Sequence, residues 1–171
     1  YLAGYSLCRR LGRGDAAAAV LAAFLVAGCN LLNLCWFGGV WYQAQALAFL
    51  LTLCAFRLFL EKSFPALGAG LCALALAVGC RPFQAVYVLP GLMLCWRQLR
   101  LKRGLAPRRA LFVLAGLCVP PALIGLVYGL YNLARFDSFF EFGHNHLPVV
   151  QTVGPQFALS RFPINLKNIL R

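Results

Sequence analysis

Long apolar segments, separated by short polar and mostly basic segments, make up most of this chain. Helices that are apolar on every side are typical of membrane spans, because a helix satisfies its own backbone polar groups where no water is present. A bilayer needs about twenty such residues per span. The pattern therefore predicts an all-α fold, a polytopic transmembrane helix bundle within residues 1–131, with spans at about residues 16–35, 43–60, 66–80, 83–96 and 110–130.

Several residues that start, stop or bend helices lie near the ends of these spans. Asp15 stands just before the first span, where its carboxylate would cap the helix N-terminus. Pro65 is expected to stop the second span, because proline cannot continue the interior of a helix. Pro120 and Pro121 are expected to kink the fifth span. Aromatic residues around a glycine pair predict an interfacial turn at residues 36–42.

Residues 66–96 fit either one kinked helix or two short helices, and the basic residues favour the second alternative. Two helices place residues 9–15, 57–64 and 97–109 on the same side, and these loops carry eleven of the sixteen Lys and Arg residues. Each short helix has about fifteen residues, a mismatch that bilayer thinning can accommodate. We therefore expect residues 97–109 to be cytoplasmic. Residues 132–171 are then an extracytoplasmic or interfacial segment that leads towards a further helix.

The composition also indicates a membrane protein. The chain is 62% hydrophobic and 12% charged, whereas about a quarter of the residues in soluble domains are charged. The net charge of +12 lies mostly at the ends of apolar spans, which indicates membrane orientation rather than a nucleic-acid-binding face. We expect an integral membrane protein that contacts membrane lipid and no nucleic acid. The chain begins at Tyr1 and ends at Arg171 without a helix cap, and we expect it to be part of a larger protein.

Cysteine and histidine do not predict a metal site. The eight cysteines lie mostly within apolar spans, and no two have the C-x-x-C spacing. His144 and His146 are two positions apart, so they would share a face of a strand but not of a helix. The sequence predicts no cofactor and leaves open whether the protein requires a divalent metal.

Arg81 is the first candidate for a binding residue. It lies between the third and fourth spans on the expected outer side, where a cation without a partner is costly. A guanidinium group binds phosphate through two parallel hydrogen bonds, so a lipid phosphate is a suitable ligand. The alternative is that Arg81 only extends to the interface to keep its charge in water.

The second candidate is the segment of residues 131–143, which mixes charged and aromatic residues directly after the fifth span. Arg135 could pair with Asp137 or Glu141, or hold an anionic ligand. Glu141 could accept hydrogen bonds from sugar hydroxyls, and His144 follows as a further candidate for binding sugar or phosphate. The alternative is an amphipathic segment in the membrane interface, held by one salt bridge.

Two motifs resemble those of the GT-C superfamily of bacterial polytopic glycosyltransferases, similar to protein O-mannosyltransferases and lipid A aminoarabinose transferases. The family segment Tyr-Asn-x-x-Arg-Phe-Gly-Ser-Pro-x-Glu-Phe-Gly follows a late membrane span. Its counterparts here are Tyr131, Asn132, Arg135, Phe136, Ser138, Glu141 and Gly143. Residues 76–82 resemble a family turn that ends in Arg-Pro, and residues 156–166 resemble the continuation into the next helix. The resemblance covers about residues 66 to 171.

The resemblance implies transfer of a sugar from a polyprenyl-phosphate donor to an acceptor at the outer face of a bacterial plasma membrane. It implies that Arg81 and Arg135 stabilise the departing phosphate, and that the segment with Tyr131 and Asn132 forms a wall of the sugar site. Asp137 replaces the glycine of the family turn, and the acidic outer loop that supplies the general base does not occur here. No catalytic residue is therefore expected within this chain. The alternative is a non-catalytic polytopic protein, such as a transporter half or an envelope-polymer assembly subunit.

Overall fold

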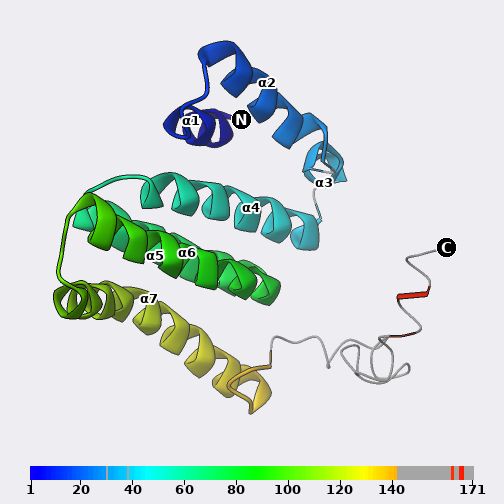
Figure 1. Ribbon diagram of the computed structural model, residues 1–171. Helices are drawn as coiled ribbons and strands as arrows, with labels where there is room; N and C mark the ends of the chain where they lie inside the picture. Colours follow the sequence, from blue (N-terminus) through cyan, green and yellow to red (C-terminus); the bar gives the residue numbers. More distant parts are fainter. Residues whose placement is uncertain (30, 38, 142–162, 164–165, 168–171) are drawn as a thin grey trace. The chain divides into compact units, whose positions relative to one another are not determined.

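The computed structural model describes residues 1–29, 31–37, 39–141, 163 and 166–167. These residues form helices and short connections with no strand among them, so the all-α prediction is confirmed. The chain divides into two compact units, Tyr1–Val127 and Tyr128–Arg171. In chain order the elements are α1 (Leu2–Arg10), α2 (Asp15–Ala27), α3 (Leu31–Phe37), α4 (Val40–Phe59), α5 (Phe64–Cys80), the 3₁₀ helix η1 (Pro82–Tyr87), α6 (Val88–Arg97), the π-helical turn η2 (Gln98–Lys102) and α7 (Pro107–Phe136) (Figure 1).

The first expected span, residues 16–35, is divided between two helices. α2 ends at Ala27, and the N–H of Gly28 bonds to the carbonyl of Phe24 before α3 begins at Leu31. Glycine is a weak helix former, which favours a helix end at this position even though the neighbouring residues are apolar. α2 has 13 residues, too few to cross a bilayer as a straight helix.

Two residues expected as helix signals have different roles in the structure. The prediction that Asp15 caps α2 is wrong, because Gly14 occupies the cap position and Asp15 is the first helical residue. Pro65 lies in the first turn of α5, where its missing N–H would have no helical partner, rather than at the end of α4. Ser63 caps that turn, since its hydroxyl oxygen accepts a 3.3 Å hydrogen bond from the N–H of Ala66.

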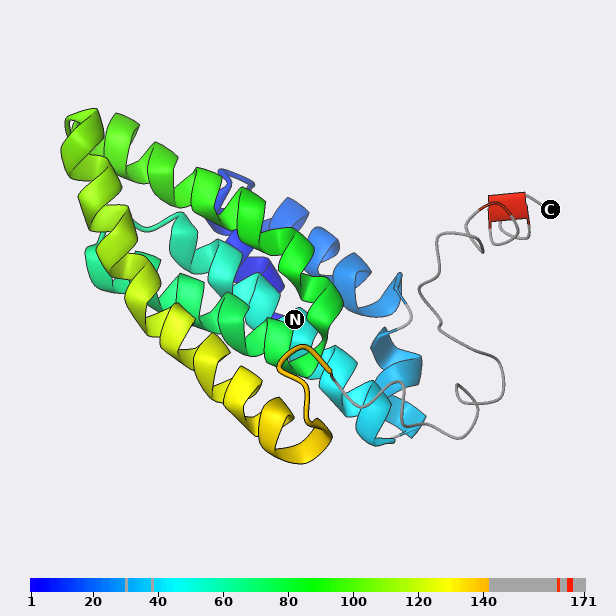
Figure 2. The ribbon, with the colours of Figure 1, turned by 90° about the horizontal axis from the view of Figure 1, so that it is seen from below.

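The chain reverses at Arg81 and forms two antiparallel elements rather than one kinked helix. Arg81 has an extended backbone, with φ −148° and ψ 108°, which is the conformation favoured before a proline. Pro82 then opens η1, which leads into α6. α6 runs back along α5, so that Gly91 of α6 lies against Leu74 of α5 (Figure 1 and Figure 2).

The core of the first unit is built around the ring of Phe59 at the end of α4. Phe59 has no exposed surface, and its ring occupies the space that side chains at Gly70 of α5 and Gly91 of α6 would need. A Cβ atom at Gly70 would lie 2.6 Å from the ring, and one at Gly91 would lie 3.0 Å from it. Small residues allow such close helix packing in membrane proteins. The buried cluster also contains Ala55, Leu67, Leu71, Leu74, Cys95, Leu99 and Ala110.

Among the described residues, two helices are long and apolar enough to cross a membrane, judged by length and composition. α4 has 20 residues and α7 has 30, and their 18-residue apolar windows have mean hydropathies of 1.3 and 2.4. A helix of about twenty residues is about 30 Å long, which matches the hydrocarbon core of a bilayer. α7 continues through Pro120 and Pro121 as one helix. Its side chains Leu111 and Phe112 are 61% and 79% exposed.

Gly70→Ala is expected to destabilise the first unit by about 1–3 kcal/mol, because the added methyl group overlaps the Phe59 ring. Gly125→Ala in α7 is the matched control, since no described atom lies within 4 Å of its added methyl group. This control should be neutral or stabilising by up to about 1 kcal/mol, the difference in helix propensity. Reversible unfolding in mixed detergent micelles measures both variants. Equal effects of the two substitutions would contradict the packing role of Gly70.

Candidate functional site

The side chain of Arg81 is positioned by α4. Its Nη2 donates a 2.7 Å hydrogen bond to the main-chain oxygen of Trp41, and its guanidinium carbon lies 5.4 Å from the centroid of the Trp41 ring. The Nε of Arg81 is buried and has no hydrogen-bond partner among the described residues. A guanidinium group has five N–H donors, so donors remain for an anion. Arg81 is therefore oriented by α4 and is not paired with any carboxylate of the described part of the chain.

A second polar contact joins α4 to η1. Thr52 is 8% exposed, and its hydroxyl lies 2.8 Å from the carbonyl of Ala48 and 3.2 Å from Oε1 of Gln84. Gln84 lies within η1, three residues after Arg81, which is the N-cap residue of this helix. The sequence did not indicate Trp41 or Gln84 as site residues, because these contacts join positions 40 and 32 residues apart. No local pattern predicts contacts of that separation.

The end of α7, in the second unit, carries the other candidate group. Arg135 donates a 2.9 Å hydrogen bond from Nη1 to the hydroxyl of Tyr131, and its guanidinium carbon lies 5.2 Å from the ring centroid of Phe136. Asn132 is 5% exposed and donates a 3.4 Å hydrogen bond to the main-chain oxygen of Phe139. Arg135 and Tyr131 thus present a cation and aromatic rings at the surface, whereas the amide of Asn132 holds the turn that follows.

The chain folds back onto α7 at this turn. Asp137 has a φ of +53°, in the left-handed region, and its N–H bonds to the carbonyl of Leu133 at 3.0 Å. The ring of Phe139 packs on Gly129, where any Cβ atom would overlap it. Glycine adopts a positive φ without steric cost, whereas the Cβ atom of Asp137 makes this conformation less favourable. Asp137 therefore holds a backbone conformation that glycine would adopt more easily.

The structure places the predicted site residues in two groups. Arg81 belongs to the first unit, whereas Tyr131, Asn132 and Arg135 belong to the second. Glu141 is half-buried and also belongs to the second unit. His144 lies outside the described residues. Within the described part of the chain, no group of three His, Cys, Asp or Glu side chains could hold a metal ion.

The basic loops of the first unit meet at one end, and we call residues 9–15, 57–64 and 97–109 together the basic end. Arg57 and Arg10 both donate to one carboxylate oxygen of Glu61, at 2.6 and 2.7 Å. The hydrogen bond from Arg57, together with the charge of Arg10, lowers the pKa of Glu61 below its ordinary value. Arg57 also donates a 2.7 Å hydrogen bond to the hydroxyl of Ser6. These bonds fix α1 to the end of α4.

The start of α2 is tied to α1 by a second carboxylate. Asp15 pairs with Arg9 at 2.9 Å and accepts a 2.8 Å hydrogen bond from the hydroxyl of Tyr5. That hydrogen bond raises the pKa of Tyr5, because removal of its proton would place two negative oxygens side by side.

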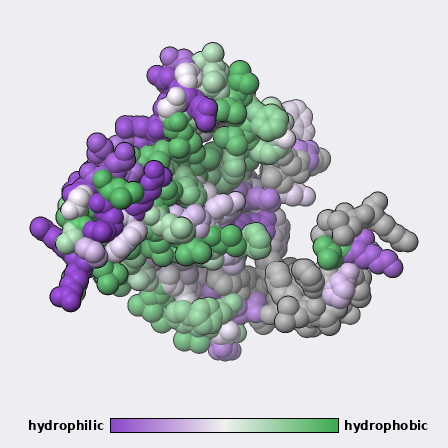
Figure 3. Space-filling model, in the orientation of Figure 1, coloured by the Kyte–Doolittle hydropathy of each residue, from purple (hydrophilic) through white to green (hydrophobic). Residues whose placement is uncertain are grey.

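The connection between α6 and α7 reaches the same end of the unit. Gln98 donates a 2.9 Å hydrogen bond to the main-chain oxygen of Phe59, and Arg103 donates one of 2.5 Å to that of Lys62. The guanidinium carbon of Arg103 also lies 3.7 Å from the ring centroid of Phe64. Figure 3, in the orientation of Figure 1, shows hydrophilic side chains gathered mostly where these connections lie, with apolar surface along the helices.

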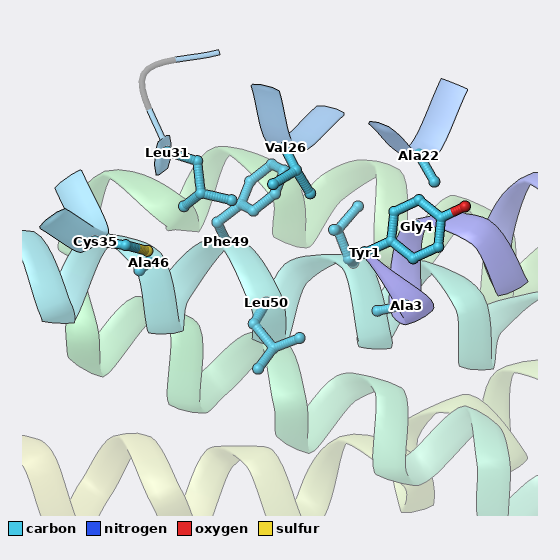
Figure 4. Close-up of a pocket in the computed structure, with 11 residues that line it drawn as sticks. Tyr1, Ala3, Gly4, Ala22, Val26, Leu31, Cys35, Ala46, Phe49 and Leu50 are labelled. Carbon is cyan, nitrogen blue, oxygen red and sulfur yellow. The ribbon is translucent and has the colours of Figure 1, made fainter. Parts of the chain in front are cut away.

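An apolar cavity of about 160 Å³ is lined by residues of α1, α2, α3 and α4. Figure 4 shows Val26 and Leu31 beside Phe49 on one side of it and Tyr1 on the other. The lining side chains are hydrocarbon apart from the hydroxyl of Tyr1 and the thiol of Cys35. A cavity with this lining suits an alkyl or isoprenoid chain better than a sugar or a phosphate.

Comparison with protein-family models, with curated proteins and with solved structures finds no match for this chain. The fold class therefore follows from the helices of the structure itself. The resemblance to glycosyltransferases depends on the motif residues between positions 76 and 166.

Protonation of Glu61 is expected to release α1 from the end of α4. Because folding lowers the pKa of Glu61, its stabilising contribution is present above the ordinary value of 4.5 and is lost as the pH falls through the lower, folded-state pKa. Amide exchange in α1, corrected for intrinsic rates, should therefore accelerate below about pH 4.5. In Glu61→Gln this exchange should already be fast at neutral pH. An acid step that persists in this variant would assign the effect to another group.

Asp137→Gly is expected to stabilise the end of α7 by about 1 kcal/mol, because glycine adopts a φ of +53° without a Cβ clash. The N–H at this position bonds to Leu133, and its protection in hydrogen exchange should rise by about fivefold. Asp137→Ala is the control, since it removes the carboxylate but keeps the Cβ atom. Equal protection in both variants would show that the charge of Asp137, rather than its backbone, is responsible.

Proposed function

We propose that this chain is the membrane-embedded part of a glycosyltransferase that transfers a sugar from a polyprenyl-phosphate donor at the outer face of a bacterial plasma membrane. Arg81 binds the donor phosphate and stabilises its departure. The end of α7, with Tyr131, Arg135 and Glu141, is a separate candidate for binding a sugar or an anionic group. The base that activates the acceptor hydroxyl comes from another part of the full protein.

Exposed apolar surface supports insertion of the helices into a bilayer. The 18-residue apolar window of α7 has a mean hydropathy of 2.4, yet only 6% of that window is buried; the corresponding buried share for α4 is 22%. The core helix of a soluble protein would be mostly buried, because a large exposed apolar surface favours association or aggregation. We infer that lipid covers these surfaces. The shorter helices α2, α5 and α6 would then be spans or part-spans shielded by their neighbours.

The clustering of basic residues supports one orientation in the membrane. The contacts of Glu61 with Arg10 and of Arg103 with the main chain of Lys62 bring the basic loops to one end of the first unit. By the positive-inside rule, this end faces the cytoplasm. Arg81 follows the last residue of α5 and contacts the start of α4, at the opposite end of both helices. It therefore faces the outer side, where the donor is used.

The proposed binding of phosphate by Arg81 is based on the hydrogen bonds that its side chain makes and lacks. Trp41 orients it, and its Nε is buried without a hydrogen-bond partner in the described part of the chain. An arginine that only extends into water would hydrate this N–H, and a buried donor without a partner is costly. Phosphate oxygens can accept hydrogen bonds from Nε and Nη of the same guanidinium group in parallel. A phosphate oxygen that reached Nε through a shift of the side chain would supply the partner that this donor lacks.

The hydrogen bond between Arg81 and Trp41 also favours a second candidate function. In a non-catalytic membrane protein, Arg81 would only tie the start of α4 to the end of α5. Loss of Arg81 would then lower stability, and a polyprenyl-phosphate donor would have no effect on the protein. The two candidates thus differ in whether the donor stabilises the protein through Arg81.

Arg81→Ala in the full-length protein, reconstituted in liposomes, is expected to reduce sugar transfer from a radiolabelled polyprenyl-phosphate donor by at least about 100-fold. Removal of a group that stabilises a developing anion has an effect of this size. Arg13→Ala, which removes an exposed arginine of the basic end, is the matched control and should retain activity.

Membrane insertion and thermal stability are measured on the same samples, with and without donor. Saturating donor should raise the melting temperature of the unmodified protein and of Arg13→Ala, but not of Arg81→Ala. Unchanged transfer by Arg81→Ala would remove this residue from the donor site. Lower stability of Arg81→Ala, together with no donor effect on any of the three proteins, would favour the non-catalytic candidate.

A further inference from the structure

Acidic residues are scarce at the basic end of the first unit. Eleven Lys and Arg residues face two carboxylates, those of Asp15 and Glu61, which leaves a surplus of nine positive charges, eleven minus two. Both carboxylates are already engaged, Asp15 with Arg9, and Glu61 with Arg10 and Arg57. Most of this positive charge must therefore be balanced by anions from outside these loops.

A pocket of about 250 Å³ lies at the basic end of the first unit. Its cationic side chains come from separate parts of the chain, namely Arg10 at the end of α1, Lys62 after α4, Arg97 at the end of α6 and Lys102 in η2. Lys62, Arg97 and Lys102 are exposed, and none of them forms an ion pair within the residues that the structure describes. Three cations therefore remain available to one ligand.

The backbone that carries these cations is held in place by hydrogen bonds. η2 is a π-helical turn, a departure from the α-helix that often occurs at functional positions. Gln98 of this turn donates to the main-chain oxygen of Phe59, and Arg103 donates to that of Lys62. The end of α6 and the connection between α4 and α5 are thus fixed side by side, which gives the pocket a defined geometry.

We propose that this pocket binds the phosphate headgroup of an anionic phospholipid in the cytoplasmic leaflet. Leu60 and Leu94 line it beside the cations, so that it offers an apolar wall to the glycerol and upper acyl carbons and a cationic wall to the phosphate. Its place at the basic end of apolar helices puts it at the level of lipid headgroups. The proposal requires the membrane orientation inferred above but not the transfer reaction.

The test removes the three available cations of the pocket and compares this with an equal loss of charge elsewhere. The pocket variant combines Lys62→Gln, Arg97→Gln and Lys102→Gln. The control variant combines Arg13→Gln, Arg108→Gln and Arg109→Gln, which are exposed positions of the basic end outside the pocket. Each protein, purified in a neutral detergent, is titrated with phosphatidylglycerol, phosphatidylcholine or inorganic phosphate. Native mass spectrometry counts the bound molecules, and circular dichroism checks the helix content.

The unmodified protein and the control variant are expected to bind one phosphatidylglycerol in preference to phosphatidylcholine. The pocket variant should bind it about 100-fold more weakly, since each basic residue contributes about fivefold to the binding of anionic lipid. If the combined variant does not fold, Lys102→Gln alone should show about a fivefold loss.

Three results would overturn the proposal. Equal weakening in the pocket and control variants would show that diffuse charge, rather than this pocket, attracts the lipid. Unchanged binding by the pocket variant would show that the lipid binds elsewhere. Inorganic phosphate that binds as tightly as phosphatidylglycerol would show a site for a free anion and not for a lipid.

Discussion

The packing of the first unit depends on the close approach of three helices around the ring of Phe59. Gly70 and Gly91 leave the space that this ring occupies, so α5 and α6 can both lie against the end of α4. In a lipid environment apolar side chains gain little by leaving the solvent, and helix association depends on van der Waals packing of this kind. The main-chain oxygen of Phe59 also accepts the hydrogen bond from Gln98, so the basic end forms at the same turn.

Antiparallel packing around this core separates the arginines into two environments. At the basic end, Arg10 and Arg57 share the carboxylate of Glu61, and their charge fixes α1 to α4. At the opposite end of α4 and α5, Arg81 has a carbonyl and an aromatic ring as partners instead of a carboxylate. A guanidinium group that is oriented but not paired with a carboxylate suits an anionic ligand. One that forms an ion pair with a carboxylate mainly stabilises the fold. The position of Arg81 therefore distinguishes it from the arginines at the basic end.

Local sequence rules predicted some parts of this structure and missed others. The distribution of basic residues favoured two helices in residues 66–96, and the chain does reverse at Arg81, whose backbone is extended because proline restricts the residue before it. The end of α2 before Gly28 was missed, because hydropathy continues unchanged across it. At the second candidate site, the turn after α7 was expected to differ from the family turn, since Asp137 replaces glycine. Its positive φ accompanies the packing of Phe139 on Gly129, a contact that no local propensity predicts.

The sequence by itself determined the helical class, the apolar character of the long helices and the gathering of basic residues between them, because these follow from periodicity, hydropathy and charge along the chain. It also indicated Arg81 and Arg135, since charged residues beside apolar spans are conspicuous. Only the tertiary structure decided their partners. The contact of Arg81 with Trp41, and the pocket formed by Arg10, Lys62 and the end of α6, join residues far apart in the chain. Such contacts arise from the way helices pack, and packing around Phe59 depends on side-chain shape rather than on any local pattern.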